Sequence, residues 1–347
     1  VENVMGKLVQ GLLMPKVAPD WYAGTRRLTE FPEAPDESLL LLGHLTIEVA
    51  EVEAAVRFFV EALDCKEGPE VDGAKVMLLG ASQIRLVPAS AGRTDLASVW
   101  PGQFYLWVED SKKALAACQK LEMSMGGVLV QEVFHLKEEG SADAILLVDP
   151  SGQNNLAVNQ APIGGMSKTM RSVLPGTDKA SNTLALIGAT YPIPAGKAGS
   201  VVRFYSHFLS GAMTKNKQGY ALNFSLGKAL HQTLTFVEDD EAQMPGETPS
   251  EKLPEVCLYV LSLAELKKVF EKCAEAGILE GASTWEEVEK KSELCFSRCP
   301  DPASETKEVV LELRHRVRAP SHSEWPLPRD LPTRASEVVT LTAPESQ

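Results

Sequence analysis

The side chains that could do chemistry in this chain are few and widely spaced. No two of the six cysteines form a Cys-X-X-Cys pair, and six cysteines in 347 residues do not make a disulfide scaffold. We therefore expect reduced, mostly buried thiols in a reducing compartment. The sequence shows no Ser-His-Asp or Cys-His arrangement and no phosphate-binding glycine loop. Any site must therefore be found through the elements that position it.

Composition and charge exclude several classes of protein. The chain has 34 basic and 47 acidic side chains, a net charge of −13, so a nucleic-acid partner is not expected. Hydrophobic residues make up 44%, which is enough for packed cores. The longest apolar stretch, Leu39 to Val49, is interrupted by Gly43, His44 and Glu48, so the sequence predicts a soluble protein with no membrane span. The length predicts two domains.

An internal duplication is the most informative pattern. A strand start followed by a helix with two adjacent aromatic residues occurs twice, with the two copies about 145 positions apart. An Asp-Pro pair lies near the end of the first copy, and a second Asp-Pro pair lies 152 positions later, near the end of the second copy. A nearly constant offset indicates that one domain occurs twice. The matching segments are Gly43–Ile47 with Gly188–Tyr191, Val56–Phe59 with Val202–Tyr205, and Asp149-Pro150 with Asp301-Pro302.

Each copy divides again into two units of the order strand, helix, strand, strand, strand. Helical spacing places Val56, Phe59, Val60 and Leu63 on one face of the first predicted helix, and Asp110 is the expected N-cap of the second. The chain is therefore predicted to contain four βαβββ modules. In the first copy the strands are expected at 40–49, 66–71, 74–80, 83–88, 104–108, 127–134, 144–149 and 155–159, and the helices at 52–63 and from 110 to about 121.

A single βαβββ unit has open strand edges and one uncovered sheet face. Two consecutive units side by side would close a curved sheet into a half-barrel with a concave cleft. The predicted fold is therefore α+β, with four βαβββ modules forming two tandem half-barrel domains. The expected parts are an N-terminal arm (1–38), a first domain (39–162), a linker (163–182), a second domain (183–318) and a Pro-rich C-terminal arm (319–347).

Two local motifs resemble those of the vicinal oxygen chelate superfamily, which includes glyoxalase I and the extradiol dioxygenases. Gly43-His44 opens a strand before a helix that carries Phe58-Phe59, and Asp149-Pro150-Ser151-Gly152 is similar to the superfamily's DPxG turn. The resemblance implies glyoxalase-like domains. It also implies one divalent metal per cleft, held by His, Gln or Glu side chains from the first and last strands of paired modules, with open positions for vicinal substrate oxygens.

In the first domain the metal positions that the resemblance implies are only partly filled by suitable residues. His44 and Gln103 could be ligands, whereas Arg85 and Leu156 stand where the superfamily has Glu. Arg85 would repel a metal beside it, but could hold an anionic ligand. This gives His44, Arg85 and Gln103 as candidate ligand-binding residues. The plainer alternatives are a hydrogen-bonded His44 and an ion pair of Arg85 with a carboxylate such as Glu48.

In the second domain the corresponding positions are Ala189, Thr235, Glu255 and Glu312. His231 lies on the same side of its strand as Thr235, because side chains alternate along a strand. The residual metal candidates are therefore His231, Glu255 and Glu312. The plainer interpretation treats the two glutamates as solvated carboxylates at strand edges.

These substitutions favour a non-catalytic glyoxalase-fold protein that acts as an interaction or assembly subunit. It would need no cofactor and would bind other protein subunits through its N- and C-terminal arms, which carry Trp21-Tyr22 and Trp325. The first alternative is a metal-dependent lyase, isomerase or dioxygenase using the residual metal candidates. The second is a protein that binds an anionic small molecule.

The start of the chain gives a further expectation about location. The sequence begins at Val1 rather than Met, either through trimming or through loss of a targeting segment. With the long arms, this favours an organelle, the plastid stroma or mitochondrial matrix, after removal of a transit peptide.

Overall fold

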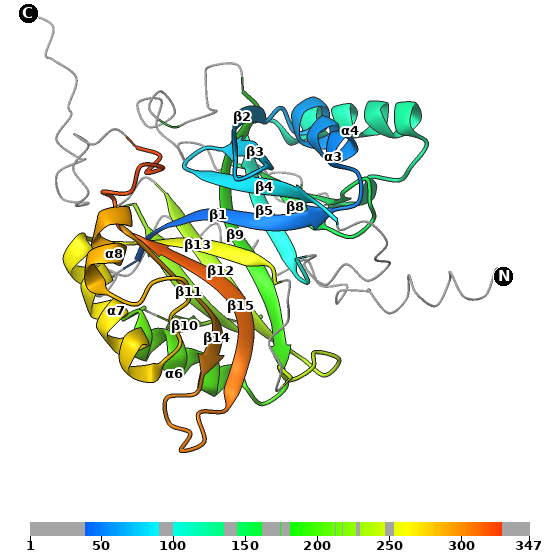
Figure 1. Ribbon diagram of the computed structural model, residues 1–347. Coiled ribbons are helices and arrows are strands. Elements are labelled where there is room, and N and C mark those ends of the chain that lie inside the picture. Colours follow the sequence, from blue (N-terminus) through cyan, green and yellow to red (C-terminus); the bar gives the residue numbers. More distant parts are fainter. Residues whose placement is uncertain are drawn as a thin grey trace, which may run out of the picture. The chain divides into compact units, whose positions relative to one another are not determined.

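The computed structural model in Figure 1 describes most of the chain between residues 39 and 327. All of these residues belong to one compact unit. The N-terminal arm and most of the linker lie outside the described residues, as does the C-terminal arm beyond 327. The described ranges are 39–89, 100–134, 144–161, 174, 181–211, 213–216, 218–226, 230–246 and 253–327.

The first two modules follow the predicted order of elements. Module one covers residues 39–88 and module two covers 103–160. Asp110 caps the second helix as expected, with its carboxylate accepting from the backbone N–H groups of Lys112 and Lys113. The elements of module one are β1 (Leu39–Val49), α3 (Val52–Arg57), η2 (Phe58–Ala62), β2 (Lys66–Val71), β3 (Ala74–Leu79) and β4 (Ser82–Pro88); those of module two are β5 (Gln103–Val108), α4 (Ser111–Met125), β6 (Val130–Phe134), β7 (Ala144–Val148) and β8 (Asn155–Gln160).

Modules three (183–239) and four (255–318) repeat the pattern with one change. In module four a short helix, α8, stands where the second strand is expected. A capping box between Thr284 and Glu287 starts this helix, and its sequence is rich in helix-forming residues. The elements of module three are β9 (Thr183–Pro194), α6 (Ala198–Phe208), β10 (Met213–Lys215), β11 (Tyr220–Ser225) and β12 (His231–Asp239); those of module four are β13 (Glu255–Val260), α7 (Leu263–Ala276), α8 (Trp285–Lys291), β14 (Glu293–Pro300) and β15 (Val309–Arg318).

The strands form one seven-stranded and one eight-stranded sheet. The orders are β14-β15-β13-β1-β4-β3-β2 and β10-β11-β12-β9-β5-β8-β7-β6. The predicted α+β class built from βαβββ modules is confirmed. The expectation that the two modules of each predicted domain share a sheet is wrong, because β1 pairs with β13 and β5 pairs with β9, both antiparallel. Module one therefore shares a sheet with module four, and module two with module three.

Hydrogen bonds at the entry to β9 support the pairing of β9 with β5. The backbone O of Asn182 accepts from Glu109 N at 2.7 Å, and its side-chain oxygen accepts from Asp110 N at 2.9 Å. These contacts hold the start of β9 beside the end of β5, where an antiparallel pair forms directly. The two modules of each predicted domain instead meet through helices, η2 with α4 and α6 with α7. Because each sheet takes strands from both halves of the chain, the domain boundaries at 162 and 183 stay predictions.

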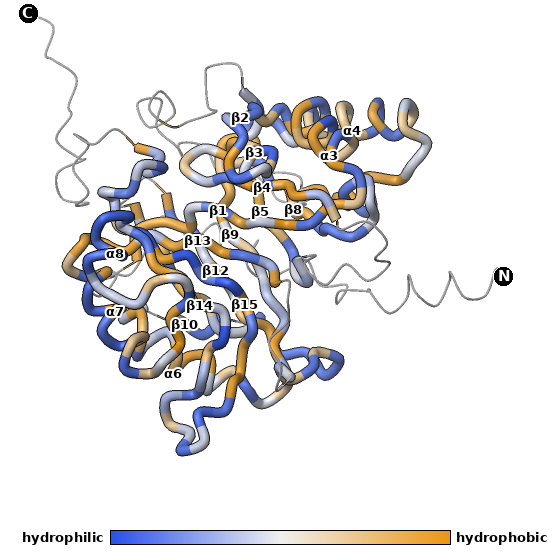
Figure 2. Tube along the Cα trace, viewed as in Figure 1, coloured by the Kyte–Doolittle hydropathy of each residue, from blue (hydrophilic) through white to orange (hydrophobic). Residues whose placement is uncertain are grey.

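The main core fills one face of each sheet and the inner sides of the helices. Figure 2 shows hydrophobic stretches along the strands and hydrophilic residues around α8. The first helix buries Phe59 and Leu63 as predicted, but Phe58 is also fully buried, whereas Val60 is 38% exposed. The cause is the π-helical turn η2, which holds more residues per turn than an α-helix and so rotates the buried face.

The DPxG segment forms the turn that precedes β8. The Asp149 carboxylate accepts from the backbone N–H groups of Gln153 and Asn154 at 2.9 and 3.0 Å. Gly152 has a φ of 73°, a conformation that glycine adopts without strain. The motif thus sets the turn that aligns β8 beside β5.

Gly102 marks the closest approach between modules two and three. A Cβ atom there would lie 1.9 Å from the backbone O of Thr190, which also accepts from Trp100 Nε1 at 2.7 Å. We expect Gly102→Ala to lower the free energy of unfolding by roughly 2–4 kcal/mol, because backbone must move. Urea unfolding measures this. Gly127→Ala is the matched control, since a Cβ there meets nothing within 4 Å, and equal losses in both variants would contradict the prediction.

Candidate functional site

Strand alternation places ionisable side chains on one face of the seven-stranded sheet. On β1, Leu45 and Ile47 enter the core, so His44 and Thr46 point to the opposite side. The same alternation on β15 sends Leu313 and Val317 inward and two arginines outward. We call the following residues the charged face: His44 on β1, Arg85 on β4, Glu255 on β13, Glu293 on β14, and Arg316 and Arg318 on β15.

Glu255 lies at the centre of one hydrogen-bonded group. Its Oε1 is 3.2 Å from His44 Nε2 and accepts from Thr46 Oγ1 at 3.1 Å. Its Oε2 accepts from Arg316 Nε at 2.8 Å. Because an ionised carboxylate can only accept, the His44 proton is assigned to Nε2. Both oxygens of Glu255 are therefore already engaged by the chain itself.

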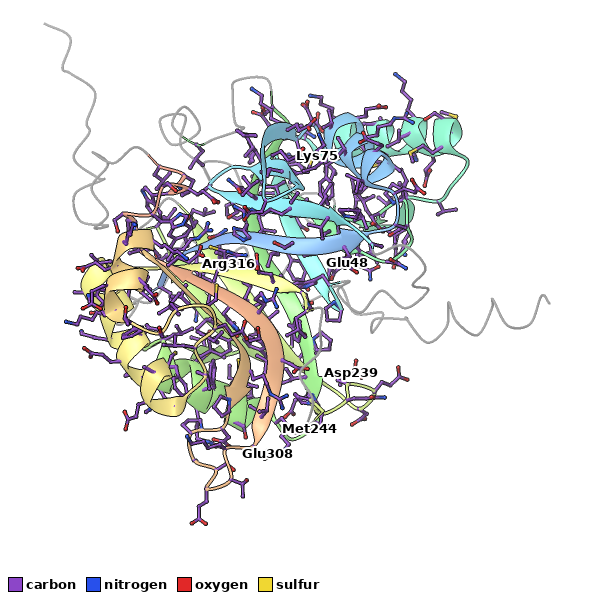
Figure 3. All side chains as sticks on the ribbon, viewed as in Figure 1. Glu48, Lys75, Asp239, Met244, Glu308 and Arg316 are labelled. Atoms are coloured by element: carbon purple, nitrogen blue, oxygen red, sulfur yellow. The ribbon has the colours of Figure 1, made fainter. Side chains whose placement is uncertain are left out.

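Glu293 joins this group to a second one. It accepts from Arg316 at 3.1 Å and from Arg318 Nε at 2.5 Å. Arg318 also donates to Glu324 Oε2 at 3.0 Å, and Arg85 donates to that same oxygen. Three arginines and three glutamates thus form one continuous network across the sheet. In Figure 3, Arg316 lies on β15 and Glu48 near the end of β1.

Glu324 belongs to the described part of the predicted C-terminal arm. After β15 the chain turns, with His322 N donating to the backbone O of Ala319 at 3.0 Å. Tyr259 OH then donates to the backbone O of Glu324 at 3.0 Å. The Trp325 ring packs edge-on against the Tyr259 ring, with 4.9 Å between the ring centroids. We call residues 321–327 the C-terminal segment. It covers the charged face.

A small cavity remains beneath the C-terminal segment. It holds about one water molecule. It is therefore too small for a substrate while the segment is in place. The lining residues are Gly43, His44, Ala81, Gln83, Tyr259, Arg318, Glu324 and Pro326.

The predicted ligand-binding residues divide between the two sheets. His44 and Arg85 lie on the charged face, 1% and 3% exposed. Gln103 lies on β5 of the eight-stranded sheet, where its backbone N–H donates to Thr190 Oγ1 at 2.9 Å. The structure therefore brings together two of the three. Arg85 does form an ion pair, as the plainer interpretation expects, and the partner seen is Glu324, 239 positions away.

The residual metal candidates also divide between the sheets. His231 lies on β12 of the eight-stranded sheet, whereas Glu255 and Glu312 lie on the seven-stranded sheet. The Glu312 carboxylate lies 3.7 Å from the Arg298 guanidinium group, and the Glu255 carboxylate forms an ion pair with Arg316. Among the residues that the structure describes, no group of three His, Cys, Asp or Glu side chains could hold a metal ion.

The charged face does not fit the divalent metal that the resemblance implies. Its two suitable donors, His44 and Glu255, are bonded to each other. Arg85, Arg316 and Arg318 surround them, and these positive charges oppose a cation at the same place. No chemical step is therefore derived through a metal here.

Burial and the arginines fix the protonation states of this face. Burial lowers the pKa of His44 to about 4, helped by the charges of Arg85 and Arg318. Burial alone would raise the pKa of Glu255, but the bonds from His44 and Arg316 hold it at about 2. Glu324 behaves alike: Arg318 and Arg85 outweigh its desolvation and bring its pKa to about 2. At neutral pH the histidine is uncharged and both glutamates are ionised.

Four residues of this arrangement were not among the predicted site residues: Glu293, Arg316, Arg318 and Glu324. The alternating arginines of Arg314-His315-Arg316-Val317-Arg318 were a visible signal, because every second residue of a strand shares a face. Glu324 had no such signal, since it lies in a Pro-rich segment without strand or helix periodicity.

The cysteines are structural, as expected. All six are free, and five are buried. Burial raises the pKa of Cys65, Cys118, Cys257 and Cys273 to about 12, so these thiols stay protonated and unreactive. None of these four is a candidate nucleophile.

The buried histidines should make stability depend on pH. Burial lowers the pKa of His44 to about 4 and of His315 to about 3, whereas an unfolded histidine has a pKa near 6.5. Below pH 6.5 the unfolded chain therefore binds protons that the folded chain does not, and acid favours unfolding. From pH 7 to 5 we expect these two histidines to lower the free energy of unfolding by about 4 kcal/mol, about 2 from each.

Urea unfolding at pH 7, 6 and 5 measures this loss. The His44→Gln variant lacks one of these groups, so its loss over the same range should be about 2 kcal/mol smaller than that of the unchanged chain. If the two chains lost equal stability, His44 would not be buried in its neutral form.

Comparison with known proteins identifies the fold. No protein-family model and no curated protein sequence matches the chain. A candidate dioxygenase from Bacillus subtilis superposes with a TM-score of 0.50 at 11% identity, over 82% of this chain and 86% of that one. Glyoxalase I from Zea mays gives a TM-score of 0.49 at 12% identity, over 86% of this chain and 95% of that one. Lactoylglutathione lyase from Agrobacterium tumefaciens gives a TM-score of 0.26 at 14% identity, over 39% of this chain and 98% of that one.

The chain therefore has the fold of the vicinal oxygen chelate superfamily. The resemblance drawn from the sequence motifs is confirmed for the fold, which contains two sheets built from the βαβββ modules. At 11% identity the likeness concerns the fold alone. None of the described helices is long and apolar enough to cross a membrane.

Proposed function

We propose that this protein is a non-catalytic member of the glyoxalase fold that acts as an interaction subunit of a larger complex. The observation that carries the proposal is the charged face. Each of its charged side chains is bonded within the chain, and the chain's own Glu324 and Trp325 cover it. A catalytic cleft needs polar groups that are free to meet a substrate.

The enzymatic alternative requires ligands that converge on one point. His231, Glu255 and Glu312 do not share a sheet, and both glutamates lie near arginines. The donor set on the seven-stranded sheet therefore speaks against a metal-dependent lyase or dioxygenase centred there.

The partner-binding role of the two arms stays a proposal, as does an organelle location. Within the C-terminal arm, residues 319–327 contact their own chain, and Trp325 packs on Tyr259. This part of the arm can meet a partner only after it leaves the charged face. The N-terminal arm and residues 328–347 lie outside the described residues.

The native size of the chain tests the proposal. Gentle extraction, blue-native separation and mass spectrometry should find it far above the 37.6 kDa of one chain, together with the same subunits in repeated preparations. Migration as a free monomer or dimer would contradict an assembly role.

A second candidate, binding of an anionic small molecule, is favoured by one contact. Arg85 and Arg318 together hold the Glu324 carboxylate. With this carboxylate removed in Glu324→Gln, citrate should raise the melting temperature, and the additional change Arg85→Leu should abolish the effect. Without any citrate effect in Glu324→Gln, this candidate fails.

A further inference from the structure

We infer that the charged face is a peptide-binding site for segments in which a carboxylate residue precedes an aromatic residue, and that the C-terminal segment is its tethered occupant. A segment of this chemistry on a partner protein would take its place. The inference rests on the proposed interaction role and names the chemistry of the partner.

The contacts that the C-terminal segment makes with the charged face are of the kinds used in peptide recognition. Two guanidinium groups hold the Glu324 carboxylate, and Tyr259 OH donates to the backbone O of the same residue at 3.0 Å. The Trp325 ring rests on the Tyr259 ring. A small inorganic anion would use only the arginines. A backbone contact and an adjoining aromatic contact add selectivity for a Glu-aromatic pair in a chain.

One buried donor shows that Glu324 does not fill the site completely. Arg85 is 3% exposed, and its Nε has no hydrogen-bond partner. The cause is that Arg85 and Arg318 both donate to one oxygen, Oε2 of Glu324. A carboxylate not held by the short connection from β15 could present two oxygens to the Arg85 fork, which is the stronger bidentate geometry.

The C-terminal segment is also placed so that it can leave. The Glu324 side chain is 29% exposed, and Trp325 and Leu327 are partly exposed. The segment lies against a small hydrophobic cluster that includes Leu41, Ala81 and Tyr259, separate from the main core. Because a short tether gives an effective concentration on the order of millimolar, a free peptide should compete poorly unless the tethered carboxylate is weakened.

Fluorescence anisotropy with the full-length chain tests the inference. The probe is a labelled peptide with the sequence of residues 321–327, Ser-His-Ser-Glu-Trp-Pro-Leu. The double variant Glu324→Gln, Trp325→Ala should bind it at least tenfold more tightly than the unchanged chain. Adding Arg85→Gln to the double variant should abolish binding. A probe with Gln in place of its Glu should bind at least tenfold more weakly.

Three results would overturn the inference: equal affinity of the double variant and the unchanged chain, no saturable binding to either, or equal affinity for the Glu and Gln probes. Citrate that displaced the probe as well as unlabelled peptide did would also overturn it, in favour of a small anion. If the double variant fails to fold by circular dichroism, Glu324→Gln alone replaces it, with the same outcomes. Loss of peptide binding with an intact native complex would refute this site and leave the interaction role standing.

Discussion

Replacing Arg318 with methionine should lower the free energy of unfolding by about 3–5 kcal/mol. The Arg318 side chain is 3% exposed and donates to Glu293 at 2.5 Å and to Glu324 at 3.0 Å. Methionine keeps much of the apolar stem but leaves two carboxylates with less compensating charge in a buried place. Removing one partner of a buried ion pair costs much more than the pair itself contributes.

Urea unfolding at pH 7 measures the effect of Arg318→Met. Arg57→Met is the matched control, because Arg57 pairs with Glu61 on the exposed surface, with side chains 48% and 51% exposed. We expect little change there, since solvent screens such pairs. If both variants lost similar stability, the charged face would be an ordinary solvated surface.

Replacing Trp100 with alanine should lower the free energy of unfolding by a similar amount, about 3–5 kcal/mol. Trp100 is fully buried, and its ring lies 5.7 Å from that of Phe104 and 5.4 Å from that of Tyr191. Its Nε1 donates to the backbone O of Thr190 at 2.7 Å. The substitution removes a large apolar side chain and a hydrogen bond where modules two and three meet.

The loss in Trp100→Ala is measured by urea unfolding against Trp285→Ala. Trp285 is a partly exposed residue at the start of α8 and packs near Phe270 at 5.8 Å. Its replacement should cost clearly less. A smaller loss for Trp100→Ala than for Trp285→Ala would show that the contact between modules two and three is not part of the core.

The elements could be predicted from the sequence because their signals are local. Helical spacing indicated the first helix, and Asp110 marked the start of α4. The pairing of sheets could not be predicted, because strands of every module share the same hydrophobic alternation and fit either neighbour. Contacts such as those at Asn182, which carries no periodic signal, support the pairing of β9 with β5.

The candidate site was predicted only in part for a related reason. His44, Arg85 and Glu255 were found because motif and strand positions point to them. The contact of His44 with Glu255 depends on the pairing of β1 with β13, which brings residues about 210 positions apart together. The role of Glu324 depends on the path of a Pro-rich segment, which no periodicity describes.

On the charged face, the side chains that could act as metal ligands are engaged by the chain itself. The first-strand donors His44 and Glu255 remain, but they are bonded to each other. Arginines occupy neighbouring strands, and a carboxylate from the chain's own segment balances them. We expect the polar side of the sheet to stabilise the fold, and the proposed role assigns it to binding rather than to chemistry.

Titration calorimetry with Ni²⁺ and Zn²⁺ tests the central claim most directly. We predict that His44→Gln and Glu255→Gln leave the binding of either metal ion unchanged, because neither residue is free to act as a ligand. Stoichiometric binding that disappears in both variants would contradict the account, since it would show that the charged face opens to form a metal centre.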